Sequence, residues 1–382
     1  MRARGGIMHP LRVALVGFGF IAERGHLPAY LASMRSGGPY KVVAVADVCA
    51  ARRALARRLV PEAHVYASHD VLLATEKGTI DVVDIATPPC DHAVIAAAAL
   101  EQGLDVLCEE PLAASLEAAK HLFADARRRR RILFPCHDRV HAPVVKSVRR
   151  VLDSGRIGDV RIATLQTFRH THARGVTEWR PDWRRDHDIG AGGIVMDHGS
   201  HSFYLAFDWM AAYPSSVSAM TSALSGGDTE DNVTCTMRFP GGRIATAYMS
   251  WTAGMSRVLY TIHGERGAIR VEDDDIEVVT KKIDRDGGLR WETESAWAGS
   301  EGADTSDPAR FRSVLDELAA AIAERTVSSL PGEDALRCIE VIDASYRSAR
   351  LGGHEVPLCG EGRLEERTAP LRPAAVIKDG AA

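Results

Sequence analysis

The sequence predicts a two-domain α/β protein, with a doubly wound parallel sheet followed by an α+β domain that has a large, mainly antiparallel open sheet. Three observations support this prediction. At 382 residues the chain is too long for one ordinary hydrophobic core. Strand and helix patterns alternate up to about residue 140. Beyond that point, strand-rich segments follow one another without intervening helices.

The first domain is organised around residues 11–22. An apolar run over residues 11–16 predicts a buried parallel strand, and it leads directly into a G-x-G-x-x-A pattern that ends at Ala22. The first glycine permits a tight turn, and the second lets a pyrophosphate approach the backbone. A second apolar run ends in Asp47, whose carboxylate suits the ribose hydroxyls of an adenosine. The pattern therefore predicts a site for NAD(H), with NADP(H) disfavoured, and its expected contacts are Gly17, Phe18, Gly19, Phe20, Ile21 and Asp47.

The remaining elements of the first domain follow the same alternation. A helix capped by Ser115 has its apolar residues on one face and ends in a run of arginines at 127–131. These cations have no aromatic neighbours, which favours a solvated helix end over a nucleic-acid surface. The other expected helices cover residues 50–59 and 92–103, and the expected strands lie at 42–46, near 65, and at 81–86, 105–108 and 132–134.

The second domain is expected to consist of a helix, a series of strands and two late helices. One face of the sheet should be covered by helices, and the other, carrying Tyr248, Met249 and Trp251, should form a homodimer or homotetramer. The helices are expected at 144–154, around 311–322 and around 336–346, and the strands at 159–168, 216–223, 232–239, 243–251, 258–264, 268–272 and 276–282. The predicted division is a flexible segment 1–10, domains 11–139 and 140–358, and a disordered tail 359–382.

Composition narrows the class of protein. The chain has 47 basic and 51 acidic residues and a net charge of -4, so charge gives no reason to expect nucleic acid or a membrane surface as partner. Its seven cysteines form no CxxC pair, and no apolar stretch has the length of a membrane span. We expect a cytoplasmic protein that acts on a small molecule.

The motif series resembles the Gfo/Idh/MocA oxidoreductases. Besides the glycine pattern and Asp47, it contains Thr87-Pro88 with His92, a Glu-x-Pro at 109–111, Trp183-Arg184, and the segment 190–201. The resemblance implies a nicotinamide-binding Rossmann domain joined to an antiparallel α/β domain, with hydride transfer in the cleft to or from sugars, cyclitols or related molecules. It assigns Thr87, Pro88, His92 and Glu109 to the cofactor site, and Arg139, Trp183, Arg184 and His198 to the substrate site.

The chain departs from the family pattern at Glu110, because family members usually have lysine there, hydrogen-bonded to the substrate hydroxyl. Three interpretations stay open. In the first, His201 donates or accepts the proton and Asp197, four residues earlier on the same helical face, assists it. In the second, Glu110 stabilises a cationic substrate, an iminium or an amino sugar. In the third, the protein binds NAD in a non-redox or sensor role.

The central region is also rich in histidine. His137 and His141 have a spacing that could clamp a metal, but Pro143 makes a regular helix through both doubtful. We therefore predict no metal site and expect the histidines to recognise substrate hydroxyls.

Overall fold

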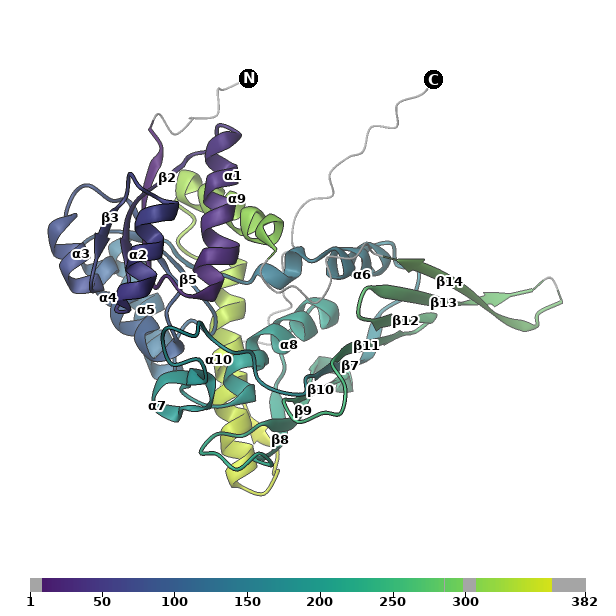
Figure 1. The fold of residues 1–382 in the computed structure, drawn as a ribbon. Coiled ribbons are helices and arrows are strands. Elements are labelled where there is room, and N and C mark those ends of the chain that lie inside the picture. The colour runs from purple at the N-terminus through teal and green to yellow at the C-terminus, as the bar shows by residue number, and fades with distance from the viewer. Residues whose placement is uncertain (1–8, 285, 298–306, 359–382) are drawn as a thin grey trace, which may run out of the picture.

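The computed structural model describes residues 9–284, 286–297 and 307–358, which form two sheets with helices packed on them (Figure 1). Most of the predicted flexible segment 1–10 and all of the predicted disordered tail 359–382 lie outside the described residues.

The first sheet is parallel and has six strands in the order β3-β2-β1-β4-β5-β6. This is the doubly wound arrangement that the alternating pattern predicts, and it places the carboxyl ends of β1, β4 and β5 next to one another. The strands are β1 (Leu11–Val16), β2 (Tyr40–Ala46), β3 (His64–Tyr66), β4 (Val82–Ile85), β5 (Asp105–Cys108) and β6 (Leu133–Pro135).

Helices cover both faces of this sheet. Ser115 accepts a hydrogen bond from the Ala118 amide and so caps α5 as predicted. The short helix α3 was not predicted, because seven residues present too little of a helical period to recognise. The helices are α1 (Leu27–Arg35), α2 (Ala50–Leu59), α3 (His69–Thr75), α4 (Pro89–Glu101) and α5 (Leu116–Arg129).

The late helix α9 (Pro308–Glu324) belongs with the first sheet. Its apolar residues, Phe311, Leu315 and Leu318 among them, are buried in the same cluster as Val13 of β1 and Tyr30 of α1. The sequence pattern had placed this helix in the second domain. The periodicity of its apolar residues identifies the buried face of the helix but not the sheet against which that face packs. The sequence therefore did not show that the chain returns to the first domain at α9.

The second sheet has nine strands in the order β14-β13-β12-β11-β7-β10-β9-β8-β15. Neighbouring strands are antiparallel except β10 and β7, which pair in parallel. Strands β14 and β15 were not predicted. The strands are β7 (Val160–Phe168), β8 (Ser216–Ser222), β9 (Asn232–Arg238), β10 (Ile244–Ser250), β11 (Arg257–Gly264), β12 (Gly267–Glu272), β13 (Asp275–Ile283), β14 (Leu289–Trp297) and β15 (Val356–Pro357).

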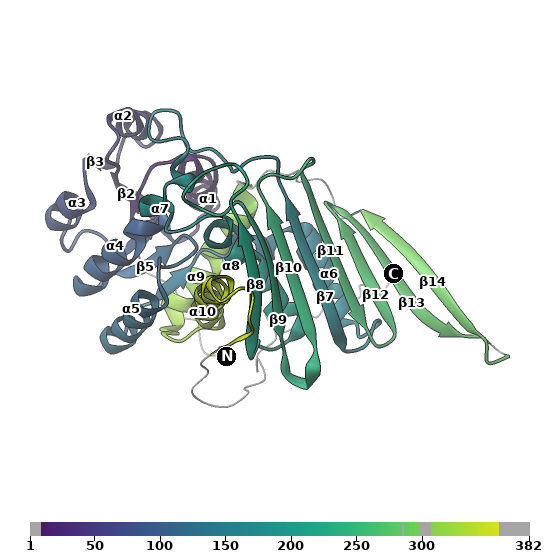
Figure 2. The same cartoon turned by 90° about the horizontal axis from the view of Figure 1, so that it is seen from below.

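One face of the second sheet packs against α6 (Pro143–Asp153), α8 (Ile194–Met210) and α10 (Leu330–Arg350), and Figure 2 shows these helices on one side of it. The prediction that Met249 and Trp251 lie on the open face is wrong. Both are buried in the core, 0% and 1% exposed, whereas Tyr248 points outward at 37%. Alternation along a strand puts Tyr248 and Met249 on opposite faces, and the helices cover the face of Met249.

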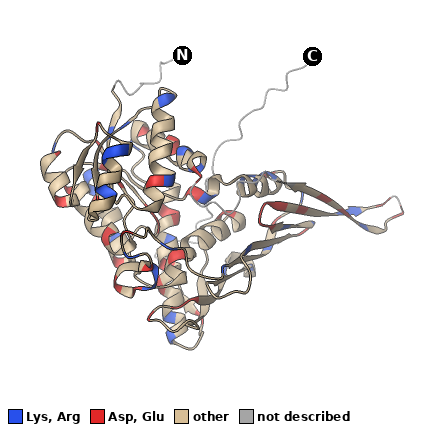
Figure 3. Ribbon diagram, in the orientation of Figure 1, with Lys and Arg blue, Asp and Glu red and all other residues tan. Residues whose placement is uncertain are grey.

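Charged side chains of both signs are interspersed over the two domains (Figure 3). The arginine run at 127–131 lies at the exposed end of α5, as predicted. Within the described residues, no helix combines the length and apolar character needed to cross a bilayer.

Candidate active site

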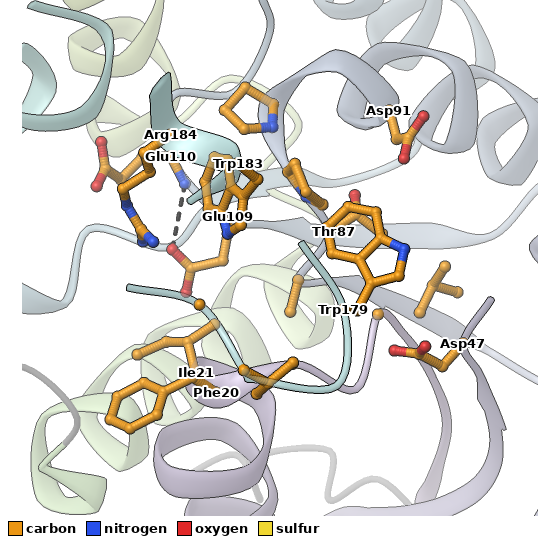
Figure 4. Close-up of a pocket in the computed structure, with 18 of the residues that line it drawn as sticks. Phe20, Ile21, Asp47, Thr87, Asp91, Glu109, Glu110, Trp179, Trp183 and Arg184 are labelled. Carbon is orange, nitrogen blue, oxygen red and sulfur yellow. Dashed lines mark hydrogen bonds between the residues drawn. The ribbon is translucent and has the colours of Figure 1, made fainter. Parts of the chain in front are cut away.

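A cavity of about 410 Å³ lies where the two domains meet (Figure 4). Its walls come from the glycine turn after β1, the ends of β4 and β5, the short 3₁₀ turn Asp138–His141, the loop 173–184, and the first turns of α8. The carboxyl ends of parallel strands are the usual ligand-binding edge of such sheets.

The glycine turn leaves room for a phosphate. Gly17 has φ of 86°, and a Cβ there would lie 2.7 Å from the carbonyl carbon of Ala86, so only glycine fits. A Cβ on Gly19, in contrast, would meet no atom within 4 Å among the described residues, which leaves its backbone open to the cavity. The next residues, Ala22–His26, form a π-helical turn before α1.

Asp47 lies at the ribose end of the expected cofactor site. Its Oδ2 accepts a hydrogen bond from the Phe18 amide at 2.6 Å, and its Oδ1 accepts one from the Cys49 amide, also at 2.6 Å. The neighbouring Arg52 donates to the carbonyl of Phe18 and pairs with Glu23 and Glu178, so its charge is already balanced. These contacts favour ribose hydroxyls over a 2′-phosphate at Asp47.

Beneath the turn, His26 connects two buried acids. Its Nδ1 lies 2.8 Å from Oδ2 of Asp84, and its Nε2 lies 2.6 Å from Oε1 of Glu109. Burial alone would lower the pKa of His26, but the two carboxylates outweigh it and raise the pKa to about 10. His26 is therefore a cation, and its hydrogen bond and charge hold the pKa of Glu109 below its usual range against the effect of burial.

The adjacent acid, Glu110, is in the opposite state. Its Oε1 lies 2.8 Å from Nε2 of His201, and its side chain is 7% exposed. Burial raises the pKa of Glu110 well above its usual value, and burial together with the charge of Arg139 lowers the pKa of His201. Both shifts in pKa favour the uncharged forms of the two side chains.

Asp197 is bonded to Arg184 and not to His201. The Arg184 Nε donates to Oδ1 of Asp197 at 2.6 Å, and the guanidinium also lies 4.2 Å from the ring centre of Trp183. The arginine lowers the pKa of Asp197 despite burial, so this acid is ionised. Burial lowers the pKa of the next residue, His198, to about 3, which makes it neutral.

The first turn of α8 is fixed by Glu230, which the sequence did not single out. Its carboxylate accepts hydrogen bonds from the amides of Gly193 and Val195 at 3.1 and 3.0 Å, and from the hydroxyl of Tyr346 on α10 at 2.8 Å. A Cβ on Gly193 would lie 1.9 Å from the Glu230 carbonyl oxygen. The glycines before α8 thus allow the close approach that positions Asp197 and His201.

The structure brings most of the predicted site residues to one cavity. It does not bring Phe18 and His92 there: the ring of Phe18 is buried below the turn, and His92 bonds the carbonyls of Thr87 and Pro111. The cavity also includes Trp179, which no motif indicated. The predicted residues that line it are Gly17, Gly19, Phe20, Ile21, Asp47, Thr87, Pro88, Glu109, Glu110, Arg139, Trp183, Arg184, Asp197, His198 and His201.

The histidines considered for a metal have other neighbours. The ring of His137 stacks on Tyr204, and His141 lies 3.7 Å from Glu317. Within the described residues, one other group could offer three ligand atoms close together, namely His26, Glu109 and Cys136. In this group the protonated His26 already balances the charge of Glu109, so we assign no metal to these three residues.

Comparisons with known proteins agree with the fold and the cavity. A model of an oxidoreductase family with an NAD-binding Rossmann fold matches residues 11–137, and one of the GFO/IDH/MocA C-terminal domain matches 145–270. The chain is 28% identical over 264 residues to trans-1,2-dihydrobenzene-1,2-diol dehydrogenase of Mus musculus, covering 65% of this chain and 74% of that protein. It is 28% identical over 300 residues to levoglucosan dehydrogenase of Pseudarthrobacter phenanthrenivorans, covering 69% and 73%.

The same fold appears in a solved levoglucosan dehydrogenase in complex with NADH and L-sorbose. The TM-score is 0.79 at 22% sequence identity, with 92% of this chain and 100% of that chain covered. An NAD-binding Rossmann domain joined to a C-terminal domain of this family defines a nicotinamide-dependent oxidoreductase. The chain belongs to the Gfo/Idh/MocA oxidoreductase family, and its first domain is the NAD-binding Rossmann domain.

The residues that line the cavity fit NAD(H). Gly19 leaves the backbone open to a pyrophosphate, Asp47 faces the ribose position, and the buried hydroxyl oxygen of Thr87 has no hydrogen-bond partner among the described residues. Together these groups would hold NAD(H) along the edge of the sheet.

We expect NADH to bind at least about tenfold more tightly than NADPH, because a 2′-phosphate would meet the carboxylate of Asp47. Asp47→Ala should reduce this preference, whereas Glu117→Ala, which removes an exposed acid on α5, should leave it unchanged. Fluorescence titration of both nucleotides measures the ratio. Tighter binding of NADPH to the unmodified protein would contradict the assignment.

The buried cation His26 should make stability depend on pH. Its folded-state pKa of about 10 lies above the ordinary value of 6.5 for histidine, so its contribution is complete below that lower value and is lost as the pH rises through the higher one. The free energy of unfolding should fall between about pH 7 and about pH 9 by up to ~1.4 kcal/mol per pH unit. Urea unfolding of His26→Gln should lack this slope, and that of the exposed-site control His121→Gln should keep it. An identical slope in all three proteins would show that His26 is not the group responsible.

Proposed function

We propose that the protein transfers hydride between NAD(H) and a small polar substrate, such as a sugar or cyclitol, with the Glu110–His201 pair supplying or accepting the proton. The single observation that supports this most strongly is the 2.8 Å contact between these two buried side chains at the cavity. The nicotinamide, when bound, supplies or accepts the hydride. The residues of this chain have to manage the accompanying proton.

The pair can move a proton as a relay. In the neutral state, Nε2 of His201 accepts a hydrogen bond from the protonated carboxyl group of Glu110, so the imidazole carries its own proton on Nδ1. During reduction, His201 donates the Nδ1 proton to the substrate oxygen and receives the Glu110 proton on Nε2. Glu110 becomes a carboxylate, and oxidation of an alcohol reverses each transfer. Asp197 assists through its charge, which raises the pKa of His201 and opposes the effects of burial and Arg139.

The cationic-substrate interpretation has less support. Glu110 is held neutral by burial, and the charge of Arg139 acts on it and on His201. A cationic substrate would be stabilised only if Glu110 lost its proton, and it would be repelled by the charge of Arg139. Both effects cost free energy in a site of reduced dielectric. The non-redox interpretation is supported by no particular contact in the cavity, and the paired acid and histidine favour catalysis.

His201→Ala should lower kcat by about 10²–10⁴-fold while the Kd for NADH stays within about twofold, because the proton is transferred in the transition state and the cofactor is held by the other domain. The substrate for this measurement is the one that an NAD(H)-absorbance screen over sugars, polyols, cyclitols and amino sugars identifies. Near-normal turnover of His201→Ala would move the proton donor elsewhere.

Glu110→Gln tests the relay itself. The amide can still donate to Nε2 of His201, so the geometry is kept while the transferable proton is lost, and kcat should fall with little change in KM. His187→Ala, which alters an exposed histidine on the short helix His187–Gly190, serves as the control and should behave like the unmodified protein. Unchanged kcat in Glu110→Gln would contradict the relay and would mean that His201 transfers the proton without Glu110.

We also propose that a second copy of the chain covers the open face of the large sheet. Phe168 and Tyr248 form an edge-to-face pair on this side, with ring centres 5.3 Å apart, and Ile162, six residues before Phe168 on the same strand, is 51% exposed. An apolar sheet face of this kind is stabilised when a two-fold partner buries it.

Tyr248→Glu should dissociate the oligomer, since it places a charge at the centre of this face, and sedimentation velocity at micromolar concentration measures the mass. Val94→Glu, on the exposed side of α4, introduces the same charge outside the face and should not change the mass. A monomeric unmodified protein, or an oligomer that withstands Tyr248→Glu, would contradict the proposal.

A further inference from the structure

The arginines of the cavity differ in whether their charge is balanced. Three of the four that line it are paired: Arg52 with Glu23, Arg174 with Asp182 at 3.0 Å, and Arg184 with Asp197 at 2.6 Å. The fourth, Arg139, has no carboxylate within ion-pair distance anywhere in the described chain. Arg139 follows β6 in the turn Asp138–His141 and is only partly exposed.

The acids near this arginine are already engaged. Glu109 is bonded to His26, Asp197 to Arg184, and Asp138 lies 3.5 Å from Arg310. Glu110 lies 2.8 Å from His201, and burial raises its pKa well above the usual value, which favours its uncharged form. Figure 4 shows Asp91, a further acid of the cavity, apart from Glu110 and Arg184. Among the four arginines that line the cavity, Arg139 is therefore the one whose charge no nearby carboxylate of the described chain balances.

A second observation concerns polar atoms that face the same end. Oε2 of Glu110 and Nδ1 of His198 are buried and have no hydrogen-bond partner among the described residues, although both residues line the cavity. Buried polar atoms are nearly always paired in folded proteins, so unpaired ones at a cavity indicate a polar ligand. Oε2 of Glu110 can accept a hydrogen bond from a hydroxyl group.

We propose that the substrate is a polyhydroxylated carboxylate, of the aldonate or uronate class, whose carboxylate is bound by Arg139 while its hydroxyls reach Glu110 and His198. One guanidinium matches the single charge and planar shape of a carboxylate. A phosphate dianion would bring a second negative charge close to Asp197 and Glu109, and the other arginines that line the cavity are already paired with carboxylates. This inference rests on the proposed function for the position of the reacting group beside Glu110 and His201.

The test measures binding without turnover, on protein first shown to be saturated with NADH. Isothermal titration calorimetry compares two pairs that differ in charge and little in shape, D-glucuronate with D-glucuronamide and D-gluconate with D-glucitol. The acid should bind about 10- to 100-fold more tightly in at least one pair, as expected for a charge-assisted hydrogen bond. The preference should shrink as salt is added.

Arg139→Met should reduce this preference to less than about twofold and leave the Kd for NADH unchanged. Arg58→Met removes an equal charge from the exposed surface of α2 and should keep the preference. The salt dependence of the unmodified protein supplies the same information if Arg139→Met does not fold.

Several outcomes would overturn the proposal. They are equal binding within both pairs, no millimolar binding of either acid, a preference that persists in Arg139→Met, and tighter binding of D-glucose 6-phosphate than of the acids. Loss of NADH binding in Arg139→Met would assign this arginine to the cofactor. Binding of an acid through Arg139 without hydride transfer in any screen would refute the proposed function and leave this inference standing.

Discussion

A close contact between Glu110 and His201, 2.8 Å from Oε1 to Nε2, joins the two halves of the molecule at the cavity. Glu110 follows strand β5 of the parallel sheet, and His201 comes from α8 of the second domain. Because the Glu110 side chain is only 7% exposed and that of His201 only 16%, each needs a correctly placed polar partner, and this constrains how the domains meet. The anchoring of α8 by Glu230 and Tyr346, and of the glycine turn against Ala86, keeps the two partners within reach.

Two adjacent acids are held in opposite states by their surroundings. Glu109 faces a histidine that a second carboxylate, Asp84, also contacts, so the charged form of His26 is favoured and Glu109 stays ionised. Burial raises the pKa of Glu110, and burial together with the charge of Arg139 lowers the pKa of His201, so the uncharged forms of both are favoured. In the mechanism that we propose, Glu109 contributes a fixed charge near the cofactor, and Glu110 holds a transferable proton near the substrate.

Much of the fold and of the site follows from local patterns. The run into Gly17 and Gly19, the acid at Asp47 and the cap at Ser115 predict their elements correctly, because strand period, turn geometry and capping depend on neighbouring residues. Two predictions from local patterns were wrong. They placed α9 in the wrong domain and Trp251 on the open face, because which sheet a helix covers, and which face of a strand is buried, depend on residues far along the chain.

The sequence by itself determined the class of protein, the cofactor edge of the sheet and most of the residues around the cavity, since these lie in short contiguous motifs at the ends of strands. Only the tertiary structure decided the chemistry at the centre. It paired Glu110 with His201 and Asp197 with Arg184, where spacing on the helix had suggested that Asp197 assists His201 directly. It also revealed His26 beneath Glu109. Ionisation depends on burial and on charges contributed by separate elements, and those quantities exist only once the chain is folded.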